Sequence, residues 1–123
     1  MLTLLHRIPR PILRGLFVAA VLVVFALTMM PLPEMTVVVS SQDKFEHAIA
    51  FLVLMLLGTG GWPRRVGWMA VGLSAYGLLI EVCQHTLTTN RFGDPLDWVA
   101  DSVGVTIGWL LLRRAARGAV AST

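Results

Sequence analysis

Residues 81–104 read EVCQHTLTTNRFGDPLDWVADSVG and join two apolar segments through a connector rich in polar side chains. Glu81 and Gln84 lie at the end of the first apolar segment, and Asp97 and Asp101 lie at the start of the second. Polar residues at membrane depth are costly and usually face a protein interior or a wet cavity. The stretch therefore predicts one polar site at one surface of a small helical membrane protein.

The composition favours a membrane protein with a single domain, residues 1–123. Hydrophobic residues make up 56% of the chain and charged residues 14%, whereas about a quarter of the residues of a soluble domain are charged. The net charge of +3 raises nucleic-acid binding as an alternative. The basic residues, however, lie at the ends of apolar segments, without a basic helix face or zinc-ligand spacing, so we expect no nucleic-acid partner. A single cysteine, Cys83, excludes a disulfide within the chain.

Four apolar segments predict an all-α integral membrane four-helix bundle. The expected helices cover about 12–30, 43–61, 66–85 and 95–112. The first segment is long enough to cross a hydrocarbon core of roughly 30 Å. No small-x-small cleavage pattern follows it, which favours a retained helix over a signal peptide. Pro31 and Pro33 are expected to end this helix, and Asp94-Pro95 predicts an N-cap followed by proline at the first helical position.

The segments outside these helices are expected to lack regular helix. Pro9 and Pro11 disfavour helix before residue 12. The stretch up to Gln42 is expected to be a loop, with an extended part at 37–39 and with Ser40 or Ser41 available as a helix cap. The small-residue tail after the last arginine is expected to fray.

The distribution of basic residues predicts the orientation. With four crossings, the N-terminus, the turn at 62–65 and the C-terminus share one side, and only Lys44 and Arg91 lie on the other. The shared side carries Arg7, Arg10, Arg14, Arg64, Arg65, Arg113, Arg114 and Arg117. The positive-inside rule then places both termini in the cytoplasm, in a multi-pass protein of the cell (cytoplasmic or inner) membrane. A re-entrant hairpin in place of the fourth crossing is the alternative.

Each of the last three expected helices has one face with polar residues at its outer end and mostly small residues toward the cytoplasm. The polar groups are His47 on the second helix, Glu81 and Gln84 on the third, and Asp97 and Asp101 on the fourth. The expected helix-packing residues are Gly77, Gly104 and Gly108. Small residues let membrane helices approach closely, within one chain or between two copies, so the sequence leaves homo-oligomer formation open. The first helix has no polar face and is expected to pack outside.

The ordered set of motifs resembles the VanZ-like family of small bacterial membrane proteins, named for a teicoplanin-resistance protein. The resemblance covers about residues 40–112. It rests on Asp43-Lys44 with His47, on Glu81-x-x-Gln84, and on Arg91, Asp97 and the Asp101/Gly104/Gly108 series. The resemblance implies a role in the cell envelope. Asp101 departs from the asparagine often found at its position, and it adds negative charge beside Asp97.

The candidate polar site comprises Asp43, Lys44, His47, Glu81, Gln84, Arg91, Asp97 and Asp101. The favoured function is non-enzymatic binding of an envelope amphiphile or a lipoglycopeptide antibiotic. Lys44, His47 and Arg91 can hold a phosphate or carboxylate head, oriented by the acids. A cationic or lipid-bearing antibiotic, attracted by the acids, is a second ligand class. Capping and interhelical hydrogen bonding are the structural alternatives for these side chains.

Two other function classes remain open. A membrane hydrolase or transferase that acts on a lipid-linked phosphate would use His47 as general base and Glu81 as general acid, or an Asp/Glu/His group with Mg²⁺ or Mn²⁺. The chain offers no serine or cysteine nucleophile beside a base and no compact metal-ligand motif, so we predict neither a metal nor a cofactor. A structural subunit of a membrane complex is the third class, in which the polar cluster only holds the helices together.

Overall fold

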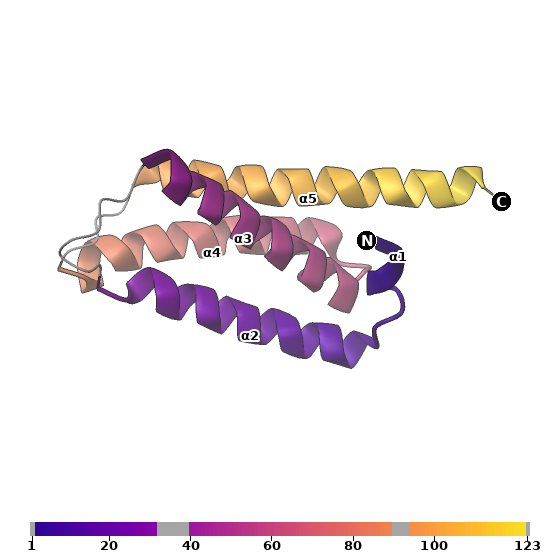
Figure 1. Ribbon diagram of the computed structural model, residues 1–123, viewed down its shortest axis with the longest axis horizontal. Helices are drawn as coiled ribbons and strands as arrows, with labels where there is room; N and C mark the ends of the chain where they lie inside the picture. The colour runs from indigo at the N-terminus through magenta and orange to yellow at the C-terminus, as the bar shows by residue number, and fades with distance from the viewer. Residues whose placement is uncertain (1, 32–39, 90–93, 123) are drawn as a thin grey trace.

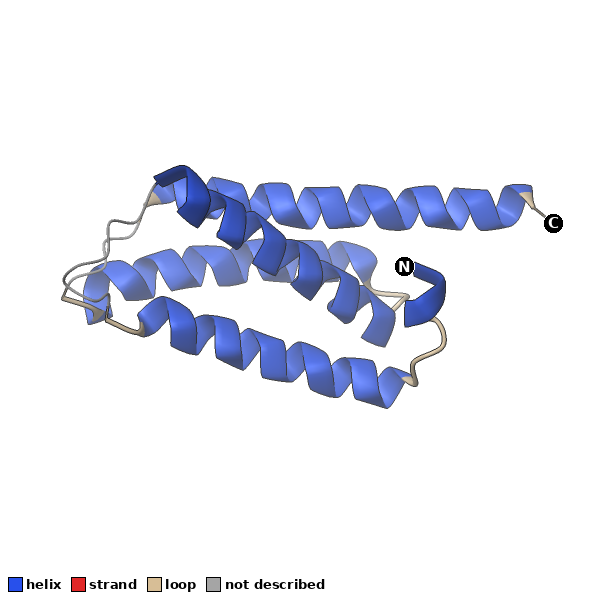
Figure 2. Cartoon of the chain, viewed as in Figure 1, coloured by secondary structure: helices blue, strands red, loops and turns tan. Residues whose placement is uncertain are grey.

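The computed structural model describes residues 2–31, 40–89 and 94–122, and within these ranges the chain forms helices and no strand (Figure 2). The helices are α1 (Leu2–Leu5), α2 (Arg10–Met29), α3 (Ser40–Gly61), α4 (Val66–Leu87) and α5 (Pro95–Ala121). The four long helices lie side by side, and α5 continues beyond the others toward the C-terminus (Figure 1). The prediction of an all-α chain is confirmed.

Three of the long helices are apolar enough to cross a membrane. The spans are Arg10–Met29, Asp43–Gly61 and Val66–Leu87. Their outward faces expose large apolar side chains such as Leu22 and Val71, which are 65% and 63% exposed. This surface suits lipid rather than water. The helix α5 is also long, but it carries acids at its start and arginines in its second half.

The helix α3 contacts α2, α4 and α5, and its most extensive contact is with α5. Phe51, Leu54 and Met55 of α3 form the centre of the apolar core together with side chains from α4 and α5. By contrast, Leu13 is the only buried residue among those described in α2, so α2 packs at the edge of the group.

Glycines set the spacing of these helices. A Cβ atom on Gly104 would overlap the carbonyl oxygen of Ala48 in α3. A Cβ atom on Gly108 would lie 3.0 Å from the Cβ atom of Met55. Because backbone atoms cannot move aside as a flexible side chain can, Gly104 is the position where α3 and α5 need a residue without a side chain.

The helix starts differ from expectation. The helix α2 begins at Arg10, and a short helix, α1, precedes it. The expectation that Pro9 and Pro11 keep the chain from forming helix before residue 12 was wrong, because proline is well tolerated within the first helical turn. The helix α3 begins at Ser40, so the predicted loop ends earlier than Gln42. The extended stretch expected at 37–39 lies outside the described residues.

The helix ends also differ. The helix α4 continues to Leu87, and α5 continues to Ala121 instead of ending near residue 112. The predicted frayed tail is therefore helical as far as Ala121. Alanine and arginine, which dominate this part of α5, have high helix propensity. In addition, the Arg113 guanidinium lies 4.8 Å from the centre of the Trp109 ring, four residues earlier on the helix.

Candidate functional site

The start of α3, the end of α4 and the start of α5 meet at one end of the structure (Figure 1). Seven ionisable side chains from these segments form what we call the polar cluster. Its members are Asp43, Lys44, His47, Glu81, Asp94, Asp97 and Asp101. Positions one helical turn apart share a face. Asp43 and His47 therefore lie on one face of α3, and Asp97 and Asp101 lie on one face of α5. The structure thus brings together six of the eight residues of the predicted site and adds Asp94.

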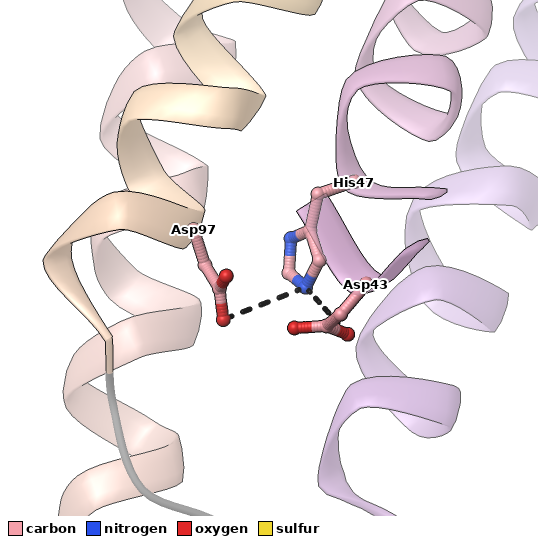
Figure 3. Close-up of side chains that lie close together, drawn as sticks. All are labelled: Asp43, His47 and Asp97. Atoms are coloured by element: carbon pink, nitrogen blue, oxygen red, sulfur yellow. Dashed lines mark ion pairs between the residues drawn. The ribbon is translucent and has the colours of Figure 1, made fainter. Parts of the chain in front are cut away.

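The imidazole of His47 lies between carboxylates on both sides. Its Nδ1 is 2.7 Å from Oδ1 of Asp101, which has no exposed surface. Its Nε2 is 3.9 Å from a carboxylate oxygen of Asp43 and 3.9 Å from one of Asp97 (Figure 3). When Nδ1 carries the proton, it donates to Asp101 and leaves the Nε2 lone pair facing the other two acids. When both nitrogens carry protons, the imidazolium is surrounded by negative charge.

The ammonium of Lys44 joins the first turns of α3 and α5. Its Nζ lies 3.1 Å from Oδ2 of Asp94 and 3.3 Å from Oδ1 of Asp97. Asp94 also caps α5, as its sequence position predicts, because its Oδ1 accepts a hydrogen bond of 2.9 Å from the Leu96 N–H. The bond from Leu96 and the bond from Lys44 hold the pKa of Asp94 below its usual range. The side chain of Asp94 is therefore a negative partner for Lys44 as well as a cap.

Asp94 was absent from the predicted site because its capping role explained its presence. The signal that identifies it is its spacing. It precedes Asp97 by three residues, so the two carboxylates follow one helix face and can share one cation.

Two buried carboxylates each keep one oxygen without a hydrogen-bond partner among the described residues. Glu81 is 7% exposed, and its Oε2 accepts a 2.7 Å hydrogen bond from the Asp94 N–H while its Oε1 is unpartnered. The Oδ2 of Asp101 is also unpartnered. A Cβ atom on Gly77 would lie 2.8 Å from this Oδ2. Gly77 thus makes room for the Asp101 carboxylate between α4 and α5.

Gln84 is not part of the polar cluster, because its side chain bonds to α2. Its Nε2 donates a 3.1 Å hydrogen bond to the Thr28 carbonyl of α2, and its Oε1 is buried without a partner among the described residues. About two turns toward the other end of α4, the Tyr76 hydroxyl donates a 2.6 Å bond to the Val21 carbonyl. Both bonds attach α4 to α2. Arg91, the remaining residue of the predicted site, lies outside the described residues.

An apolar groove of about 270 Å³ runs along α4 and the start of α5 beside the polar cluster. Glu81 forms part of its wall, together with apolar side chains that include Leu78, Val82 and Trp98. The Trp98 Nε1 donates a 3.0 Å hydrogen bond to the Ser74 carbonyl, which fixes the indole between the two helices. A polar site and an apolar surface therefore share one residue, Glu81.

The cluster can hold positive charge. It contains five carboxylates, one ammonium and one imidazole, and two sets of three residues bring metal-ligating atoms within 4.8 Å of one another. These sets are Asp43, His47 and Asp97, and His47, Glu81 and Asp101. No family model matches the chain, and neither a curated protein nor a solved structure matches it. The function is therefore argued from the geometry of the cluster together with the motifs of the sequence.

Proposed function

We propose that the chain is a VanZ-like integral membrane protein of the bacterial cell envelope. In this proposal, the polar cluster binds the positively charged head of an amphiphile, such as an amine-bearing lipoglycopeptide of the teicoplanin type. The observation that carries the proposal is the position of the acid-rich cluster directly beside an apolar groove, with Glu81 in both.

The charges of the cluster favour a cationic head over a phosphate. Lys44 already pairs with Asp94 and Asp97. His47 already pairs with Asp101. A phosphate would have to displace these acids, whereas an ammonium group would add donors to carboxylates that outnumber the bases. Hydrogen bonds between charged donors and carboxylates are the strong ones, and at the edge of a membrane they are only partly screened by water.

The groove supplies a place for the apolar part of the ligand. An acyl chain lying along Leu78 and Val82 would follow α4 away from the cluster, and the Trp98 indole, bonded to the Ser74 carbonyl one turn beyond Leu78, would flank the tail. A small amphiphile would thus contact protein on one side and lipid on the other.

The proposed orientation is supported by the opposite end of the molecule. There, α1, the turn after α3 and the middle of α5 converge, since Leu5, Pro63 and Leu112 line one cavity. The Arg14 Nε donates a 3.0 Å hydrogen bond to the Gly61 carbonyl at this end. The arginines of all three segments therefore gather together, and the positive-inside rule places them in the cytoplasm. With α5 as a fourth crossing, both termini are cytoplasmic and the polar cluster faces outward.

The experiment is protection of a teicoplanin-susceptible Gram-positive host that expresses the chain. Wild type is compared with Glu81→Gln and Asp97→Asn, and Glu46→Gln serves as the control because Glu46 is an exposed acid of α3 outside the cluster. We expect wild type and control to raise the inhibitory concentration while the two cluster variants do not, at equal abundance in the membrane. Equal protection by all four proteins, or no protection by wild type, would overturn the proposal.

The His47–Asp101 pair supports a second candidate, a hydrolase or transferase for a lipid-linked phosphate. An Nδ1 held at 2.7 Å by a buried carboxylate leaves Nε2 able to accept a proton, as a general base must. Purified protein would then release phosphate from a polyprenyl phosphate or diphosphate, and His47→Gln would abolish the release. If wild type and His47→Gln give the same background, the candidate is excluded.

A further inference from the structure

We propose that His47, Glu81 and Asp101 bind one divalent transition-metal ion, with ligand chemistry suited to Zn²⁺. The three residues come from three different helices, α3, α4 and α5, and each offers a ligand atom within 4.8 Å of the other two. The inference goes beyond amphiphile binding and does not depend on it, although both involve Glu81, because it is argued from the ligand atoms of the inner part of the cluster and not from the groove.

Unpartnered oxygens point to a missing cation. Glu81 and Asp101 are 7% and 0% exposed, and each has one oxygen without a hydrogen-bond partner among the described residues. A buried carboxylate is retained at acceptable cost only when it is paired, hydrogen-bonded or bound to a metal. A metal ion between the two carboxylates and the imidazole would satisfy both at once.

The outer acids of the cluster have other partners, which distinguishes them from this inner set. Asp94 and Asp97 share the Lys44 ammonium. Asp43 has a side chain that is 32% exposed and can therefore be hydrated. Among the described residues, His47 is the one basic side chain that is grouped with the buried carboxylates of Glu81 and Asp101. The shortage of positive charge is consequently greatest at Glu81 and Asp101.

The ligand set selects the class of metal. An imidazole with two carboxylates suits Zn²⁺ and its first-row neighbours, whereas Mg²⁺ and Ca²⁺ prefer sites made of oxygen alone. Bonds of about 2.0–2.2 Å in a tetrahedral site place ligand atoms roughly 3.4 Å apart, so the ligand atoms must shift when the metal binds, and the 2.7 Å contact between His47 Nδ1 and Asp101 Oδ1 must lengthen if both atoms are ligands. Rotation of the two carboxylate side chains supplies this movement. Three protein ligands leave at least one position open for water or another ligand.

The test uses the full chain in detergent micelles, with any purification tag removed and after treatment with a chelator. Zn²⁺ is titrated calorimetrically, and bound metal is counted by elemental analysis. We expect one equivalent to bind, and we expect Glu81→Gln and Asp101→Asn each to weaken binding by at least about tenfold. Glu46→Gln should bind as wild type does.

Glu81→Gln is the sharpest variant, because a glutamine oxygen can still accept the Asp94 N–H and keep the local fold. If Asp43→Asn abolishes binding while Glu81→Gln does not, the assignment to the inner set is wrong. Absence of stoichiometric Zn²⁺ binding by wild type overturns the proposal altogether.

A second readout does not depend on the variants being stable. Co²⁺ added to wild type should give visible absorption bands of a site with nitrogen and oxygen ligands, saturating at one equivalent and displaced by Zn²⁺ but not by Mg²⁺. A spectrum identical to that of hydrated Co²⁺ would contradict the inference.

Discussion

The Nδ1 atom of His47 lies 2.7 Å from Oδ1 of Asp101, beside a close contact between α3 and α5 at Gly104. Ala48, the next residue of α3, has its carbonyl oxygen against Gly104, three residues after Asp101 on α5. The contact between the two backbones therefore sets the distance between the imidazole and the buried carboxylate. Helix packing and the geometry of the polar cluster should change together.

Gly104→Ala tests this coupling. The added methyl group would meet the Ala48 carbonyl, so α3 and α5 must separate. Overpacking of this kind costs about 1–3 kcal/mol, and we expect a lower melting temperature in detergent together with weaker Zn²⁺ binding. Gly118→Ala is the control on the same helix, since a methyl group there meets nothing within 4 Å and alanine favours helix. Equal stability of the two variants would show that the close approach does not position the site.

Substitutions of Asp94 separate its two roles. Asparagine can still accept the Leu96 N–H but cannot pair with Lys44, whereas alanine does neither. We expect Asp94→Ala to lower the melting temperature more than Asp94→Asn does. The pKa of Asp94 is lowered in the folded protein, so its charge stabilises the fold above the unfolded-state pKa of about 4, and this contribution is lost as the pH falls through the lowered value. Wild type and Asp94→Asn should therefore differ at pH 7 and converge in acid. A constant difference over that range would argue against a role for the charge.

Gln84→Leu should change neither the binding of Zn²⁺ nor the binding of the amphiphile. The substitution removes one hydrogen bond to the Thr28 carbonyl, and it also removes a buried acceptor that lacks a partner. Interhelical hydrogen bonds in membranes contribute about 0.6 kcal/mol on average, so the free energy of unfolding should change by less than about 1 kcal/mol. Unchanged Zn²⁺ affinity and unchanged protection of the host would assign Gln84 to helix packing. Loss of either at normal abundance would return Gln84 to the site.

Thiol labelling in intact cells tests the orientation. In a Cys83→Ser background, Thr89→Cys and Arg64→Cys place single thiols at exposed positions at opposite ends of the structure. A membrane-impermeant maleimide should label Thr89→Cys in intact cells and Arg64→Cys only after permeabilisation. The reverse pattern would place the polar cluster on the cytoplasmic side. It would contradict the proposal that the cluster binds an amphiphile at the outer surface of the membrane.

The features of the fold that depend on short stretches of sequence were predictable. Apolar length identified the four long helices, and Asp94-Pro95 identified the start of α5. The helix ends were less predictable. Arg113 and the alanines after it extend α5 through propensity and a contact with Trp109, whereas their charge and small size had suggested an end.

Six of the seven members of the polar cluster followed from helical spacing, Asp94 being the exception, but the pairing of the side chains did not. Spacing alone cannot show that Lys44 is shared by Asp94 and Asp97 or that His47 is oriented by Asp101, because those contacts depend on the rotation of each helix about its axis. The metal-ligand set was not predicted for the same reason. Its members are separated by 34 and 20 residues, and no compact motif joins them. Gly77 was expected to pack helices, and its contact with the Asp101 carboxylate emerged only from the structure.

The measurement that tests the proposed function most directly is binding of matched amphiphiles to the purified protein in lipid nanodiscs. An amine-bearing lipoglycopeptide and its N-acetylated form share one apolar tail and differ in one positive charge. We expect the amine form to bind wild type at least about tenfold more tightly, a difference that weakens with added salt and in Asp97→Asn. Equal affinity of the two forms for wild type would contradict a cation-binding polar cluster.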